Sequence, residues 1–123
     1  MQHNQSIAQA TLIGKELAFV TFIRDYLQFG FDGPVLNAYV NPVVFLQGKT
    51  HVRGDADYSN IVISLINKIV KDVLETDKTE LRIELSDEAA ISIPLQRDTS
   101  RFGAEAAVLF TDDRVLRPEN VPT

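Results

Sequence analysis

The residues best suited to chemistry lie in one polar stretch, residues 47–57. Within it, His51 could serve a hydrolase-like enzyme as its base, but no glycine-flanked serine accompanies it as a nucleophile. Asp55 and Asp57 could bring two carboxylates near a hard cation. Asp57 is equally well placed as the N-cap of a following helix, and isolated histidines without an acidic or thiol cluster do not make a metal site. We therefore expect solvated loop side chains, no metal and no cofactor, and we favour a protein without catalytic activity.

Two short motifs in the same stretch match binding loops only in part. The run Gly48-Lys49-Thr50 resembles the end of a phosphate-binding loop, but the glycine required five positions earlier is replaced by Val43. The run Arg53-Gly54-Asp55 matches a cell-adhesion tripeptide, and a glycine turn that leads into the helix explains it equally well. Neither motif predicts a binding site.

Length and composition are typical of one globular domain that spans residues 1–123, with loose ends at residues 1–5 and 117–123. The net charge of −5 comes without any Lys or Arg stripe, so no nucleic-acid partner is expected. The chain lacks cysteine, a secretory signal pattern and the ~20-residue apolar run of a membrane span. These features predict a cytoplasmic protein that does not enter a membrane.

Hydrophobic periodicity predicts an α+β fold. A 3.6-residue period indicates a helix from Tyr58 to Ile69, and a capping-box spacing at Ser6 indicates a shorter helix before Gly14. Apolar alternation indicates strands, most clearly over residues 79–85, and the alanine-rich residues 103–110 favour a short helix. We expect one antiparallel sheet of about five to seven strands, with two main helices on one face and the short helix at the C-terminal end.

The two halves of the chain share a sequence pattern. Residues 12–17 align with residues 65–70, which places Gly14 over Asn67, and both residue types tolerate the left-handed conformation that ends a helix. Two explanations fit this likeness. Either an α-β-β-β unit has been duplicated, or two amphipathic helix–strand–strand units resemble each other for physical reasons alone.

Several segments together resemble small bacterial hypothetical proteins that have no assigned activity. The resemblance lies in Leu12–Lys15, residues 25–33, residues 41–43 and residues 103–108. These are fold-pattern residues rather than a functional motif. The resemblance implies a bacterial, cytoplasmic domain of unknown function and assigns no site residue.

Aromatic residues are concentrated between residues 19 and 45, where the first predicted strand is apolar on both faces. Three interpretations fit. The strand is central and covered, or it forms a subunit interface, or the aromatic residues line a pocket for a small molecule. The leading hypothesis is a non-catalytic interaction module that forms a homodimer through Ala18, Val20 and Phe22. The alternative is a small-molecule binding domain whose pocket is lined by the following aromatic residues: Phe29, Phe31, Tyr39 and Tyr58.

Overall fold

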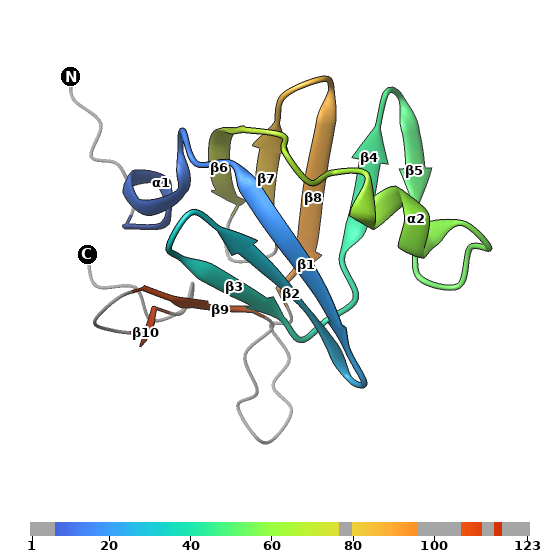
Figure 1. Ribbon diagram of the computed structural model, residues 1–123, viewed down its shortest axis with the longest axis horizontal. Helices are drawn as coiled ribbons and strands as arrows, with labels where there is room; N and C mark the ends of the chain where they lie inside the picture. Colours follow the sequence, from blue (N-terminus) through green and yellow to red (C-terminus); the bar gives the residue numbers. More distant parts are fainter. Residues whose placement is uncertain (1–6, 77–79, 96–106, 112–114, 117–123) are drawn as a thin grey trace.

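The fold consists mainly of β-strands in two antiparallel sheets that pack against each other (Figure 1). A computed structural model describes residues 7–76, 80–95, 107–111 and 115–116. The strands of the first sheet, in spatial order, are β1 (Leu17–Ile23), β2 (Tyr26–Phe31), β3 (Val35–Ala38), β9 (Ala107–Phe110) and β10 (Val115–Leu116). The strands of the second sheet are β5 (Lys49–His51), β4 (Val43–Leu46), β8 (Ala89–Pro94), β7 (Glu80–Leu85) and β6 (Val70–Thr76).

The predicted α+β fold, with one sheet under two main helices, is therefore wrong. The described helices, α1 (Ile7–Leu12) and α2 (Tyr58–Ile63), have six residues each. Neither is long and apolar enough to cross a membrane. The predicted C-terminal helix is also wrong in its described part, because Ala107–Phe110 forms β9 and pairs with β3 along its length. The loose ends expected at residues 1–5 and 117–123 lie outside the described residues.

Alternation along the strands explains how the core forms. In β7, the apolar side chains Leu81, Ile83 and Leu85 are buried, while the charged residues between them are only half-buried. The same alternation in β2 buries Leu27 and Phe29. Because each sheet has one apolar face, packing the two faces together removes both from water and forms a single core.

The two sheets are joined where β1 and β6 begin. Asn67 donates its backbone N–H to the Leu17 carbonyl at 2.7 Å, and Gly14 donates to the Val70 carbonyl at 2.9 Å. These two bonds are equivalent under the alignment that places Gly14 over Asn67, and both residues adopt positive φ angles of 90° and 86°. An antiparallel bridge between Glu16 and Ile69 lies at the centre of this junction. The backbone contacts at this junction thus repeat in the two halves of the chain under the same alignment.

A β-bulge follows the junction in both units. The register shifts between Leu17 and Phe19 in β1, and between Val70 and Asp72 in β6. The bulge in β1 changes which side chains share a face. Leu17 then lies on the core side together with Val20 and Phe22, because these three residues are paired with core residues of β2.

Candidate functional site

The most exposed apolar element among the described residues is β1, which lies at one edge of the first sheet. Phe19 and Phe22 are 41% and 39% exposed, and Ala18 and Thr21 are exposed as well. No residue of β1 is charged. The interpretation that this strand is central and covered is therefore wrong.

The hydrogen-bonding pattern of β2 shows which of its backbone groups face β1. The Phe31 N–H donates to the Pro34 carbonyl at 2.8 Å, so the backbone of Phe31 bonds on the side of β3. Bonding direction alternates along a strand between antiparallel neighbours. Gly30 and Gln28 therefore direct their backbone groups toward β1.

The free edge of β1 follows from the same alternation. Phe19 lies opposite Gly30, and Thr21 lies opposite Gln28. The backbone groups of Phe19 and Thr21 therefore form hydrogen bonds with those of β2. Val20 and Phe22 consequently direct their N–H and carbonyl groups away from the sheet. Within the described part of the chain, no strand pairs with this side of β1 beyond Leu17. Two of the three residues predicted for the interface, Val20 and Phe22, thus present a hydrogen-bonding edge, and Ala18 lies in the bulge beside it.

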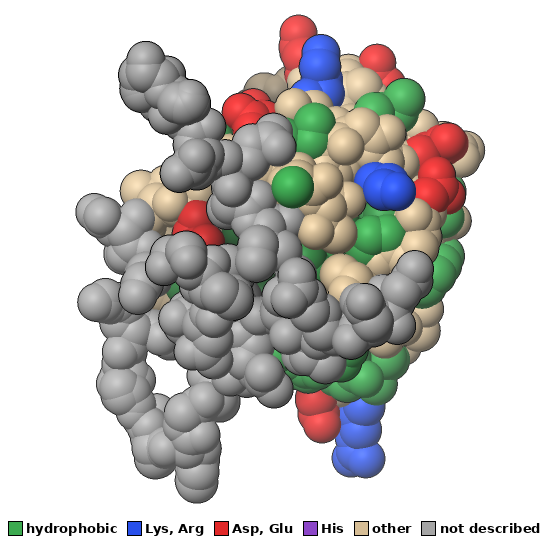
Figure 2. Space-filling model, turned by 90° about the vertical axis from the view of Figure 1, so that its left-hand side faces the viewer, with side chains coloured by type: hydrophobic (Ala, Val, Ile, Leu, Met, Phe, Trp, Pro, Cys, Tyr) green, Lys and Arg blue, Asp and Glu red, His purple; other side chains and the backbone are tan. Residues whose placement is uncertain are grey.

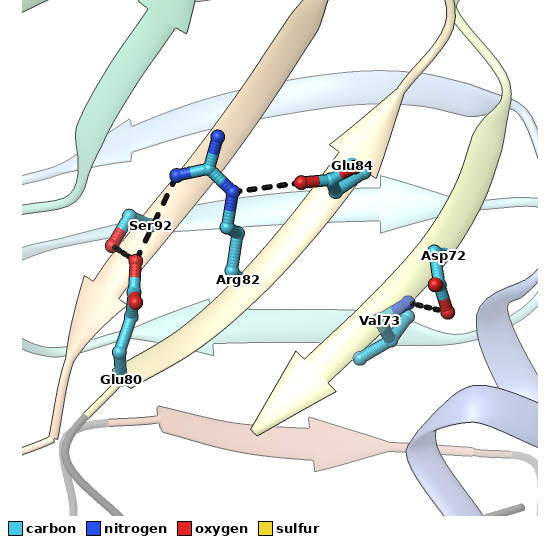
Figure 3. A network of polar contacts seen from close by, with 6 residues as sticks. All are labelled: Asp72, Val73, Glu80, Arg82, Glu84 and Ser92. Carbon is cyan, nitrogen blue, oxygen red and sulfur yellow. Dashed lines mark hydrogen bonds and ion pairs between the residues drawn. The ribbon is translucent and has the colours of Figure 1, made fainter. Parts of the chain in front are cut away.

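The equivalent edge of β6 is occupied by side chains. The Gln9 side-chain amide of α1 donates to the Val73 carbonyl at 2.8 Å. The Asp72 carboxylate accepts the Val73 N–H, also at 2.8 Å (Figure 3). Val73 therefore has both of its outward backbone groups satisfied, and Lys71 adds an exposed charge to this edge. Such side chains protect an edge strand against pairing with another chain.

Among the described residues, neither of these caps has an equivalent on β1. The alignment of the two units places Val62 at the position of Gln9, and Phe19 at the position of Asp72. Both side chains are hydrocarbon and cannot bond to the backbone of Val20, which is the equivalent of Val73. The two aligned edges therefore differ in their hydrogen bonds: side chains bond to the Val73 backbone of β6, whereas β1, which α2 contacts, has no such side-chain bond among the described residues.

The other two sheet edges are too short to compete. β5 has three residues, and Lys49 gives it a charge. β10 has two residues. Short and charged edge strands are poor templates for pairing. β1 is therefore the one long unprotected edge among the described strands.

The outer face of β1 and β2 is shaped by Gly30. An added Cβ at Gly30 would lie 2.0 Å from the Phe19 ring, so the ring occupies the space above the glycine. Further along this face, the Tyr26 and Tyr39 rings lie 4.8 Å apart between centroids. The Asn37 amide donates to the Tyr39 hydroxyl at 2.8 Å. An aromatic surface consequently continues from β1 across the adjacent strands.

The four residues predicted to line a pocket do not form one site. Phe29, Phe31 and Tyr58 belong to the packed core, whereas Tyr39 is 41% exposed on the outer face. The Tyr58 hydroxyl donates to the Pro42 carbonyl at 2.6 Å. Burial raises the pKa of Tyr58 to about 12, although the nearby Arg53 charge opposes the shift. These contacts indicate that Tyr58 anchors the start of α2.

The polar stretch at residues 47–57 is more ordered than a loop. Gln47 and Gly48 both have positive φ angles, and they form the two-residue turn between β4 and β5. A hairpin turn of this kind explains the motif that resembles a phosphate loop. The Asp55 carboxylate accepts the Val52 N–H at 2.9 Å, so the adhesion-like tripeptide is a closed turn. Asp57 occupies the N-cap position of α2, as predicted, but its side chain makes no cap hydrogen bond.

The three residues considered for chemistry in this stretch, His51, Asp55 and Asp57, lie in a strand, a turn and a helix N-cap position, respectively. His51 is half-buried in β5, opposite Val44. No group of three or more His, Cys, Asp or Glu side chains that could hold a metal is found among the described residues.

The outer face of the second sheet carries charges that are already paired. The Arg82 guanidinium lies 2.9 Å from Glu84 and 4.6 Å from the centre of the Phe45 ring. Ser92 donates to Glu80 at 2.5 Å in the same network (Figure 3). On the molecular face in Figure 2, the visible Lys and Arg side chains lie apart from one another, with Asp and Glu side chains among them. These arrangements contrast with the uncharged edge of β1.

A comparison of the chain with protein-family models, curated proteins and solved structures gives no match. The candidate site is therefore defined by its geometry alone, as the unprotected edge of β1 together with Phe19 and Phe22.

Proposed function

We propose that the protein is a non-catalytic interaction module that acts as a homodimer through the edge of β1. The observation that carries the proposal is the contrast between two equivalent edges. β6 is capped by Gln9 and Asp72, while β1 has uncharged side chains and outward backbone groups at Val20 and Phe22. An exposed apolar edge strand is a template for pairing with another chain. A cytoplasmic location is part of the proposal, since a chain without cysteine needs no oxidising compartment to fold.

Lysine substitutions at two equally exposed positions test this proposal. Phe22 on β1 and Leu74 on β6 are both 39% exposed, so a lysine at either site removes a comparable apolar side chain. We expect Phe22→Lys to be monomeric by size-exclusion chromatography with light scattering, because lysine on an edge strand opposes pairing. Leu74→Lys should remain dimeric like the wild-type protein. A dimeric Phe22→Lys variant, or a monomeric wild-type protein, would contradict the proposal.

A further inference from the structure

The residues of β1 beyond the bulge form a sequence that complements itself. We infer that two copies of the chain pair antiparallel through residues 19–23, with Thr21 of each copy on the two-fold axis. This inference rests on the proposed homodimer and specifies its strand pairing. The bulge between Leu17 and Phe19 limits the regular edge to these five residues.

Backbone geometry selects this register. With Thr21 on the axis, Val20 of one copy lies opposite Phe22 of the other, on both sides of the axis. Val20 and Phe22 are the residues whose N–H and carbonyl groups face outward, so each such pair exchanges two hydrogen bonds. Placing Val20 on the axis would instead require Ala18, which lies in the bulge, to pair with Phe22.

The side chains also match in this register. Phe19 lies opposite Ile23 of the second copy, and Val20 lies opposite Phe22, so each contact joins an aromatic ring to a β-branched side chain. Thr21 lies opposite Thr21 of the second copy. Aromatic–β-branched and Thr–Thr pairs are favourable between antiparallel strands. Because residues 18–23 contain no charge, the two copies do not repel each other across the axis.

The protection of the other edges explains why pairing would stop at two copies. Val73 on β6 is capped by Gln9 and Asp72, and β5 and β10 are short. Among the described strands, a second copy can therefore use only β1, and an interface between identical patches closes as a two-fold dimer. We therefore expect a single second copy of the chain at the edge of β1, rather than a fibre in which strand pairing continues without limit.

A single introduced cysteine tests the pairing directly, because the chain contains none. Thr21→Cys would place two sulfur-bearing residues opposite each other in a non-hydrogen-bonded pair, with Cα atoms about 4.5 Å apart, which suits a disulfide. We expect a covalent dimer on a non-reducing gel after mild oxidation. The matched control is Leu74→Cys, at the equivalent position of capped β6, which should stay uncrosslinked. Equal crosslinking of both variants would overturn the inference.

A proline substitution tests the hydrogen bonds. Val20→Pro removes the outward N–H donor but no bond between β1 and β2, so the subunit fold should persist. It deletes two bonds per dimer and should weaken dimerisation by roughly 10- to 100-fold. Unchanged dimerisation, or no crosslink in a dimeric Thr21→Cys protein, would refute the strand pairing while leaving the homodimer intact. A wild-type protein that is monomeric in the same assay would instead refute the proposed function.

Discussion

Gly30 and Phe19 provide a quantitative test of the outer face of β1. Gly30 has an ordinary strand conformation, so its lack of a side chain is explained by the Phe19 ring above it. We predict that Gly30→Ala displaces this ring. The effect should depend on Phe19, and a double-mutant cycle with Phe19→Ala measures that dependence.

The expected magnitude follows from burial. With 41% of Phe19 exposed, more than half of its surface is covered. That corresponds to about 100 Å² of apolar area and about 2.5 kcal/mol at 25 cal/mol per Å². If Gly30→Ala exposes roughly half of this buried area, the protein loses about 1.2 kcal/mol of stability. Replacing glycine by alanine in a strand also stabilises the protein by about 0.5–1 kcal/mol. Gly30→Ala alone should therefore destabilise by only about 0.5 kcal/mol.

The cycle separates these opposing effects. In the Phe19→Ala background, Gly30→Ala should stabilise the protein by about 0.5–1 kcal/mol, which gives a coupling energy of about 1.2 kcal/mol. Urea unfolding of all four proteins at one protein concentration provides the free energies, since dimerisation makes stability depend on concentration. Equal effects of Gly30→Ala in both backgrounds would refute the contact.

Two further predictions concern the caps and the buried phenol. The double variant Gln9→Val and Asp72→Phe removes both caps from β6 and replaces them with the side chains found at equivalent positions near β1. We expect light scattering to show assemblies larger than a dimer, because both long edges can then pair. A variant that stays dimeric would contradict the role of the caps. Tyr58→Phe removes the bond to the Pro42 carbonyl and should cost about 1 kcal/mol at neutral pH. The pKa of Tyr58 is raised from 10.0 to about 12 in the folded protein. Between about pH 10 and pH 12 the Tyr58 phenol therefore ionises in the unfolded chain but not in the folded one, which lowers the stability of the wild-type protein. Tyr58→Phe should reduce this alkaline loss in unfolding measurements, and an unchanged loss would count against the buried phenol as its cause.

Local patterns in the sequence predicted many of the strands but overestimated the helices, and they missed β5, expected as a loop, and β9, expected as a helix. Alternation located β2, β7 and β8 well because it reports directly on which side chains face a core. The helix predicted to extend to Ile69 ends at Ile63. Its later residues keep a helical spacing of apolar side chains, but Asn67 and Val70 donate their backbone N–H groups to the start of β1 and the turn before it. That junction depends on residues fifty or more positions away, which local periodicity does not report.

The candidate site was predicted in part. The apolar character of β1 was visible in the sequence, and it directed attention to Val20 and Phe22. The bulge after Leu17 was not visible in the sequence. Strict strand alternation would place Leu17 and Val20 on opposite faces, whereas the structure places them on the same face. Gln9 and Asp72 were missed as caps. Comparing the two aligned halves could have revealed the difference, since Asp72 aligns with Phe19. The edge of β6 thus carries a charged residue where the edge of β1 carries an apolar one.

The central claim is that two copies of the chain associate through β1, and native mass spectrometry of the untagged wild-type protein tests it most directly. Over a dilution series, we predict a species at twice 13.7 kDa that dissociates to the single chain without any additional bound mass. A single chain at every concentration would contradict the claim. A single chain that carries a small molecule lost on denaturation would contradict it as well, and would favour a ligand-binding protein instead.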